Sequence, residues 1–347
     1  MSPVPQCAPR PWSACVIVLA AGLVLAACGA PAPRPFTGVV GVPSLSIAIP
    51  LQVVGCTASD SCVALGASGS DVAPTSTGEV RTSSSTWHAL EVPGAPSSLL
   101  TSLSCWSQGC LAGGVGPAGD LLWRYLNASP AITVAGAPSG GRGVESLSCF
   151  GPGSCALLDT TDIVGDARLS FTSDGGATWT GPEPLAWAGG DVVTSMSCHD
   201  AQQCVVTATD ARGGAAVEAT ADGGATWRAG VVDAAWSSLA SLACQQRQCR
   251  ALATSALGSL AVHSANYGAT WTGTLLTAHA TALACPLLGP CVLVGHTTTQ
   301  APWIARWRGV RIVAPAFEYV PSPLIGVACG DTLCATIGVS TLAVLRP

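Results

Sequence analysis

The feature that most constrains this chain is a pair of cysteines, five or six residues apart, that occurs seven times. The pairs are Cys56/Cys62, Cys105/Cys110, Cys149/Cys155, Cys198/Cys204, Cys244/Cys249, Cys285/Cys291 and Cys329/Cys334. The first cysteines of successive pairs lie 49, 44, 49, 46, 41 and 44 residues apart. Self-similarity at this period is typical of propellers, solenoids and repeat arrays.

The residues around each pair predict a β-hairpin. A large apolar residue lies two positions before each first cysteine and a small residue lies directly before it, as in Leu103-Ser104-Cys105. This period of two predicts a strand. A second β-like run follows the second cysteine, as in Cys62-Val63-Ala64-Leu65. Each pair is therefore expected to span the turn of a hairpin, and each repeat has room for four short strands.

The number of cysteines agrees with this pattern. Of the 17 cysteines, 14 form the seven pairs, and the others are Cys7, Cys15 and Cys28. In an exported protein the pairs predict one disulfide in each repeat, because disulfides persist in oxidising compartments. Zinc is the alternative, but its ligands must converge at one point. Here each pair belongs to a separate repeat and only five histidines are present. We expect no metal and no other cofactor.

The N-terminal segment reads as a targeting signal. Arg10 precedes an apolar run over 14–27, and the run ends in Leu25-Ala26-Ala27-Cys28. This ending resembles the lipobox of bacterial lipoproteins, which implies that 1–27 is a signal peptide and that Cys28 carries the lipid. Residues 28–35 would then be a Pro-rich tether to the outer leaflet of the cytoplasmic membrane. An ordinary cleavable signal peptide with an incidental cysteine is the alternative.

A second motif occurs in three repeats, between the expected third and fourth strands. Its residues are Ser173, Asp174, Gly176 and Trp179, then Asp222, Gly224 and Trp227, and finally Asn266, Gly268 and Trp271. The motif resembles the Asp-box, or bacterial neuraminidase repeat. Its expected role is structural, because Asp or Asn side chains accept hydrogen bonds from nearby backbone N–H groups and brace a turn.

The two ends of the chain complement each other. Only 13 residues follow Cys334, which leaves no room for a fourth strand, whereas Pro35-Phe36-Thr37-Gly38 is similar to Thr178-Trp179-Thr180-Gly181. We therefore expect 36–347 to form an all-β, seven-bladed propeller with four-stranded blades. Residues 36–48 would supply the outer strand of the last blade and close the ring. The chain resembles exported bacterial propellers of the sialidase-like superfamily, including those related to photosystem II assembly factors.

Acidic residues gather in the connections expected on the face opposite the cysteine hairpins. They are Asp71, Asp120, Asp159, Asp162, Asp191, Asp210, Asp233 and Glu145. This face is the candidate binding face, although loops are also where solvated charges ordinarily lie. The net charge is −5 and all 14 basic residues are arginines. Nucleic acid is not expected as a partner, because such partners need a basic face.

The sequence favours a binding or assembly module for a protein or glycan, acting as a monomer that contacts the membrane only through its lipid. The alternative is a glycoside hydrolase of the sialidase-like or carboxylate-pair type. The expected first strands contain no arginine for a sialidase arginine triad, and the tyrosines are only Tyr125, Tyr267 and Tyr319. We therefore assign no catalytic residue, and whether the chain is an enzyme stays open, with a non-enzymatic role favoured.

Overall fold

The computed structural model describes residues 40–41, 51–59, 61–68, 75–81, 87–91, 99–116, 119–127, 129–138, 141–160, 167–185, 191–286, 289–314, 322–338 and 342–345. The signal peptide, Cys28 and the tether lie outside these residues, as do most of 36–48, Asp71 and Asp162. By its contacts the chain divides into Met1–Thr37 and Gly38–Pro347. All described strands belong to the second unit.

The second unit is an all-β propeller with four-stranded blades. Six sheets each use four consecutive antiparallel strands. Their strands are β2 Leu51–Cys56, β3 Cys62–Ser68, β4 Thr75–Arg81, β5 Trp87–Glu91; β6 Leu99–Trp106, β7 Gly109–Gly116, β8 Gly119–Leu126, β9 Ser129–Ala135; β10 Gly143–Gly151, β11 Ser154–Thr160, β12 Ala167–Thr172, β13 Thr180–Pro184; β14 Val192–Cys198, β15 Cys204–Thr209, β16 Ala215–Thr220, β17 Arg228–Ala229; β18 Trp236–Gln245, β19 Gln248–Ser255, β20 Gly258–Ser264, β21 Thr272–Leu275; and β22 His279–Ala284, β23 Cys291–His296, β24 Pro302–Arg308, β25 Arg311–Val313.

A further four-stranded sheet combines the two ends of this unit. It contains β26 Leu324–Cys329, β27 Cys334–Gly338, β28 Leu342–Leu345 and the two-residue strand β1 Val40–Gly41, in the order β1-β28-β27-β26. Val40 pairs with Val344 and Gly41 with Ala343. The remainder of the predicted closing strand, 36–48, is outside the described residues.

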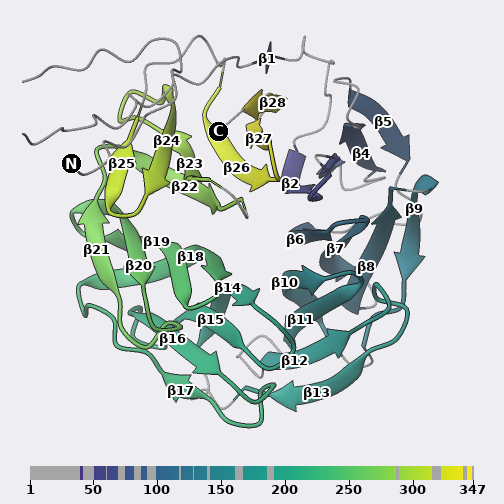
Figure 1. Ribbon diagram of the computed structural model, residues 1–347, viewed down its shortest axis with the longest axis horizontal. Coiled ribbons are helices and arrows are strands. Elements are labelled where there is room, and N and C mark those ends of the chain that lie inside the picture. Colours follow the sequence, from purple (N-terminus) through teal and green to yellow (C-terminus); the bar gives the residue numbers. More distant parts are fainter. Residues whose placement is uncertain are drawn as a thin grey trace, which may run out of the picture. The chain divides into compact units, whose positions relative to one another are not determined.

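The sheets of this unit follow one another around a ring, with the first strand of each sheet nearest the centre and the fourth strand of each continuous sheet at the periphery (Figure 1). Apolar clusters join neighbouring sheets. One cluster, for example, contains Val205 and Val217 from one sheet and Leu239, Ala251 and Val262 from the next. Because the second strands are buried on both faces, they read in the sequence as almost continuous apolar runs, as in β11, β15 and β23.

The first and last sheets also share a core. Leu51, Val54 and Trp87 of the first sheet pack with Ile337 and Val344 of the last. The two ends of the row of sheets are therefore joined by buried apolar side chains.

Six of the seven first strands contain an irregularity four residues before their first cysteine, where the register with the second strand shifts. Threonines occupy this position in three strands and reach the next sheet. The Thr101 hydroxyl donates to the Val144 carbonyl, and that of Thr281 donates to the Leu324 carbonyl over 2.8 Å. The bulge thus turns a polar side chain toward the neighbouring blade.

Within the described ranges, no helix has the length and apolar character needed to cross a membrane.

Candidate functional site

All seven predicted disulfides are present, and each lies within one repeat. Their Cα–Cα distances are 3.9–4.1 Å, because the two cysteines are directly opposite each other on paired strands, as for Cys105 and Cys110. The prediction that each pair spans the turn of a hairpin is confirmed.

The Asp-containing turns are braced by their acidic or amide side chains. One carboxylate oxygen of Asp174 accepts from the N–H groups of Ala177 and Thr178, at 3.0 and 2.9 Å. The Thr178 hydroxyl donates to its other oxygen over 2.6 Å. Hydrogen bonds from Thr178 and from the Thr172 hydroxyl lower the pKa of Asp174 to about 2. Asp222 and Asn266 accept from Thr226 and Thr270 in the same way.

These turns are also hydrogen-bonded to the cysteine hairpins of their own blades. The N–H of Gly175 donates to the Gly153 carbonyl over 2.9 Å, and the N–H of Gly223 donates to that of Gln202 over 3.0 Å. In the third copy, the backbone N–H of Tyr267 donates to the Arg247 carbonyl over 3.0 Å. The expectation that both kinds of turn lie on one face is therefore confirmed, and we call this face the cysteine face.

Tyr267 departs from its counterparts in backbone conformation. Its φ is 56°, in the left-handed region where the other two copies have Gly175 and Gly223. A tyrosine in this region is strained. It lies in a braced turn next to the hairpin of its own blade, and no hydrogen bond joins its side chain to an acidic residue of the described ranges.

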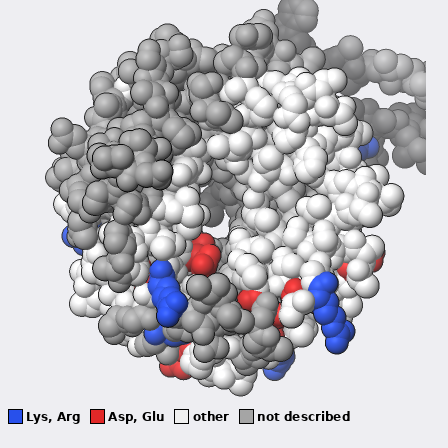
Figure 2. Space-filling model, turned by 180° about the vertical axis from the view of Figure 1, so that it is seen from behind, with Lys and Arg blue, Asp and Glu red and all other residues white. Residues whose placement is uncertain are grey.

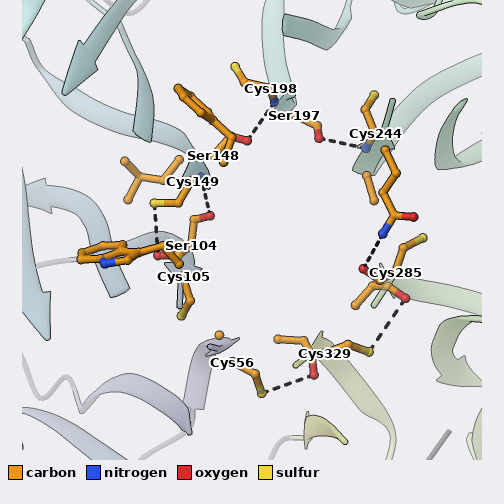
Figure 3. A pocket seen from close by; sticks show the side chains of 18 of the residues that line it. Cys56, Ser104, Cys105, Ser148, Cys149, Ser197, Cys198, Cys244, Cys285 and Cys329 are labelled. Atoms are coloured by element: carbon orange, nitrogen blue, oxygen red, sulfur yellow. Dashed lines mark hydrogen bonds between the residues drawn. The ribbon is translucent and has the colours of Figure 1, made fainter. Parts of the chain in front are cut away.

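A central cavity of about 970 Å³ opens at the cysteine face. Its wall is made by the cysteine ends of the seven first strands and by adjacent hairpin residues such as Trp106, Phe150 and His199. Figure 3 shows the first cysteines arranged around this opening. The structure thus offers a large cavity at the cysteine face, whereas the sequence pointed to the opposite face for binding.

The two cysteines of each disulfide differ in their surroundings. The first cysteines line the cavity, whereas the second cysteines are buried in the core and line no part of it. Cys155 is fully buried in a cluster with Leu157. Cys249 is fully buried in a cluster with Ala251. Of each disulfide, therefore, only the first cysteine is part of the cavity lining. The buried second cysteines are Cys62, Cys110, Cys155, Cys204, Cys249, Cys291 and Cys334.

Serine hydroxyls join neighbouring blades along the cavity wall (Figure 3). The N–H of Cys149 donates to the Ser104 hydroxyl oxygen over 2.9 Å, that of Cys198 to Ser148 over 2.8 Å, and that of Cys244 to Ser197 over 2.9 Å. The sequence showed only that a small residue precedes each first cysteine. The spacing between blades, which gives the hydroxyls their partners, is not encoded in that local pattern.

Other contacts continue the ring where the small residue is not serine. The Gln245 side-chain amide donates to the Cys285 and Pro286 carbonyls, at 3.2 and 2.8 Å. The sulfur of Cys56 lies 3.5 Å from the Ala328 carbonyl oxygen. Because that sulfur belongs to a disulfide and carries no proton, this is a close contact and not a hydrogen bond.

The cavity wall carries little charge. Of its described lining residues, only His199 and Asp331 have titratable side chains that are not disulfide-bonded. No group of three or more His, Cys, Asp or Glu residues suited to hold a metal ion occurs in the described ranges. The chemistry that the wall offers to a ligand is therefore that of hydroxyls, amides, backbone groups and apolar side chains.

Several acidic residues predicted for the opposite face brace their own loops. Asp210 accepts from the N–H groups of Arg212 and Gly214, both over 2.8 Å, and these bonds, that from Gly214 first, lower its pKa. Asp191 accepts from Ala211, and Asp233 accepts from Ala235. On the face shown in Figure 2, the acidic side chains of the described residues are few and lie among arginines. The picture shows no broad acidic patch.

Asp159 is not available for binding, which corrects the sequence-based assignment. Its side chain is fully buried, and both of its oxygens accept from the Arg168 guanidinium, at 3.1 and 2.6 Å. Asp159 and Arg168 are opposite each other on β11 and β12. A buried carboxylate is stabilised by a bidentate arginine of this kind, so the pair is structural.

Asp120 lies beside this ion pair, on β8 of the preceding blade. Burial, and then the Asp159 carboxylate, raise the pKa of Asp120 to about 7. Both of its oxygens are out of reach of solvent, and neither makes a hydrogen bond of normal geometry. Two adjacent carboxyls are what a carboxylate-pair hydrolase needs, but here one of them is fully buried and bound by Arg168. This pair cannot act on a substrate that enters from solvent.

Glu145 lies at the bulge of β10. Its carboxylate accepts from the Thr160 hydroxyl over 3.4 Å, and burial raises its pKa. Of the other tyrosines, Tyr125 is buried in the core and Tyr319 lies outside the described residues. Among the described residues, neither Tyr125 nor Tyr267 makes a side-chain hydrogen bond to an acidic residue.

Comparison with known proteins supports the fold. No family model matches the sequence, and no curated protein matches it. Among solved structures, one described as YCF48 bound to D1 peptide is similar with a TM-score of 0.62 at 14% identity, covering 90% of this chain and 95% of that one. YCF48 from Cyanidioschyzon merolae has a TM-score of 0.58 at 11% identity, covering 90% and 98%.

An enzyme is among the similar structures as well. The virginiamycin B lyase from Staphylococcus aureus has a TM-score of 0.62 at 10% identity, covering 89% of this chain and 99% of that one. The class that these comparisons define is the β-propeller. At such identities the likeness extends to the fold alone, because one fold supports many functions.

Proposed function

We propose that this chain is an exported β-propeller lipoprotein that binds a polypeptide partner at its central cavity and acts as an assembly module. The observation that carries the proposal is the cavity itself, which is about 970 Å³ in volume, nearly free of charge and held by seven disulfide-bonded hairpins. A cavity of this size accommodates an extended segment of a partner. That YCF48 has been seen with a D1 peptide agrees with this mode of action.

The anchoring part of the proposal rests on sequence. The apolar run that ends in Leu25-Ala26-Ala27-Cys28 supports lipidation of Cys28 after removal of 1–27. Residues 28–35 then tether the propeller to the outer leaflet of the cytoplasmic membrane. The disulfides agree with an oxidising compartment.

We further propose that the composite sheet is the seventh blade of a propeller of the Asp-box type. Residues 36–48 would form its outer strand, of which the pairing of β1 with β28 is the described part. A covered outer edge also favours a monomer, because an open strand edge would invite pairing with a second chain.

The test is site-specific photo-crosslinking in the native cell envelope. A photoreactive amino acid replaces His199, which is exposed and lines the cavity. The control position is Leu257, which is 83% exposed in the turn between β19 and β20, at the other end of its blade. A discrete polypeptide adduct from position 199 and none from 257 is expected. Equal labelling at both positions, or no polypeptide adduct, refutes the proposal. If position 199 is crosslinked to envelope polysaccharide and to no polypeptide, the glycan alternative is favoured.

A further inference from the structure

Six serine hydroxyls of the cavity wall are arranged in two tiers on three consecutive blades. They are Ser102 and Ser104 on β6, Ser146 and Ser148 on β10, and Ser195 and Ser197 on β14. Each accepts one backbone N–H from the next blade, over distances between 2.8 and 3.1 Å. The blades therefore hold all six oxygens in place.

These bonds use only part of the capacity of each hydroxyl. A serine hydroxyl has one proton to donate and two acceptor lone pairs. Each of the six accepts a bond in the structure, and none donates to any other group of the described residues. The wall formed by β6, β10 and β14 thus retains six hydroxyl protons, and we call it the serine wall.

The remainder of the cavity ring differs in chemistry. In the corresponding positions directly before the first cysteine, it has Gly55, Ala243, Ala284 and Ala328, which have no polar side-chain atoms. At these positions the cavity therefore has hydroxyl donors on one side and methyl groups or backbone on the other, where the further uncharged polar side chains are the glutamines of the β18–β19 hairpin. The two titratable residues of the lining, His199 and Asp331, lie in or beside hairpin turns and not on the serine wall.

The spacing of the hydroxyls matches that of a peptide backbone. Two serines separated by one residue on a strand lie about 7 Å apart, since each residue advances the strand by about 3.3 Å. In an extended peptide, the carbonyl groups that face one side recur at the same interval of two residues. A segment that runs along the wall would place successive carbonyls opposite successive tiers.

We propose that the serine wall binds main-chain carbonyl groups of an extended, uncharged polypeptide segment inserted into the cavity. This deepens the proposed function and rests on it. Each hydroxyl oxygen accepts one N–H bond and keeps its proton and one lone pair, so it can donate to a carbonyl oxygen, which only accepts. The two-residue interval of these donors matches the carbonyl groups of an extended peptide and is what favours a peptide backbone over a glycan. Small apolar side chains on the other edge of the segment would face Ala243, Ala284 and Ala328.

The test removes the donors and measures peptide binding. Short random peptides are displayed and selected on the full mature protein, and the affinity of an enriched peptide is measured by fluorescence anisotropy. The variants are Ser104→Ala, Ser148→Ala and Ser197→Ala, singly and combined. Alanine occurs naturally at this position in three other blades, so the fold accommodates it. Each lost bond should weaken binding about fivefold, and the combined variant should weaken it by at least tenfold.

A second measurement shows whether the hydroxyls contact the peptide backbone. Replacing one amide of the enriched peptide by an ester weakens its carbonyl as an acceptor. The ester should lower affinity for the wild-type protein but not for the combined variant, because the effects of two groups in direct contact are not additive. Ser237→Ala is the control, since the Ser237 hydroxyl donates to the Thr254 carbonyl away from the cavity, and it should leave the affinity unchanged.

The outcomes separate the two proposals. Unchanged affinity in the combined variant, or additive effects of ester and alanine, overturns the serine wall while peptide binding stands. If no peptide is enriched and no polypeptide is crosslinked from position 199, the proposed function itself fails. If soluble glycan fragments bind and the serine variants weaken them, the ligand is a glycan and the inference is wrong.

Discussion

Substitution of Asp120 by asparagine should stabilise the protein at neutral pH. The Asp120 carboxyl rests against the backbone of Gly141, so closely that a Cβ at Gly141 would lie 1.7 Å from its Oδ2. The charged groups nearest to it are Asp159, which opposes its ionisation, and Arg168, which favours it. Asparagine keeps the shape of the side chain and cannot ionise, so it removes the repulsion between the two carboxylates.

The sign follows from the pKa. In the folded protein the pKa of Asp120 is about 7, above its ordinary value of 3.8. The protonated form is therefore favoured by folding, and its contribution to stability is complete below about pH 4 and is lost as the pH rises to about 7. Each unit of pKa corresponds to about 1.4 kcal/mol. The difference between 3.8 and about 7 therefore corresponds to about 4 kcal/mol of unfolding free energy. Because the residue as a whole is only partly buried and its surroundings can relax, this figure is an upper bound, and we expect about 2 kcal/mol.

Thermal unfolding with the disulfides intact, measured at several pH values, tests this reasoning. Asp120→Asn should melt several degrees higher than the wild type at about pH 8, and the difference should vanish near pH 4. Asp210→Asn is the matched control with the opposite sign, because its backbone hydrogen bonds lower its pKa. It should destabilise the protein at neutral pH. A difference for Asp120→Asn that is the same at both pH values, or absent at both, would refute the argument.

Four further predictions follow from the chain's other features. Cys28→Ala should release the protein from membranes or stall its processing; a normally processed variant that stays on membranes contradicts lipidation. Non-reducing peptide mapping should find seven bridges, each worth about 2 kcal/mol; a bridge between repeats contradicts this. Gly55→Ala should lower stability by about 1–3 kcal/mol, because its Cβ would lie 2.6 Å from the Cys105 sulfur; unchanged melting argues against it. Deletion of 36–48 should lower stability and promote aggregation, whereas deletion of 29–33 should not; equal melting of the two would count against a closing strand.

Features that depend on neighbours in the sequence could be predicted. The period-two alternation before each first cysteine predicted the hairpins, and the expectation of four short strands in each repeat agrees with the six sheets that use four consecutive strands. The turn around Asp174 was also predictable, because the side chain and the N–H groups that it binds are three or four residues apart.

Features that depend on strand register or on contacts across blades could not. Asp159 and Arg168 are nine residues apart, and the strand register alone makes them opposite. The sequence held one clue to the burial of Asp159, since this residue continues the apolar run Ala156-Leu157-Leu158 of a strand buried on both faces. The burial of Asp120 depends on the approach of Gly141 from the next blade, and no local pattern shows this. For the same reason, the serines before the first cysteines appeared only as small residues.

The contacts between the first and last sheets bear on how the ring is held closed. Trp87, Leu51 and Val54 share a buried cluster with Ile337 and Val344, and burying large apolar side chains of this kind contributes about 1.5–3 kcal/mol each. The described pairing of β1 with β28, by contrast, involves two residues on each side. Closure at the level of the core is therefore supported by packing between β2, β3, β5, β27 and β28, and the N-terminal segment would chiefly cover the outer edge of β28. The cavity and its serine wall depend on the inner strands, which that packing holds in place. Loss of residues 36–48 should accordingly promote aggregation through the exposed edge while ligand binding at the cavity is retained in the protein that remains soluble.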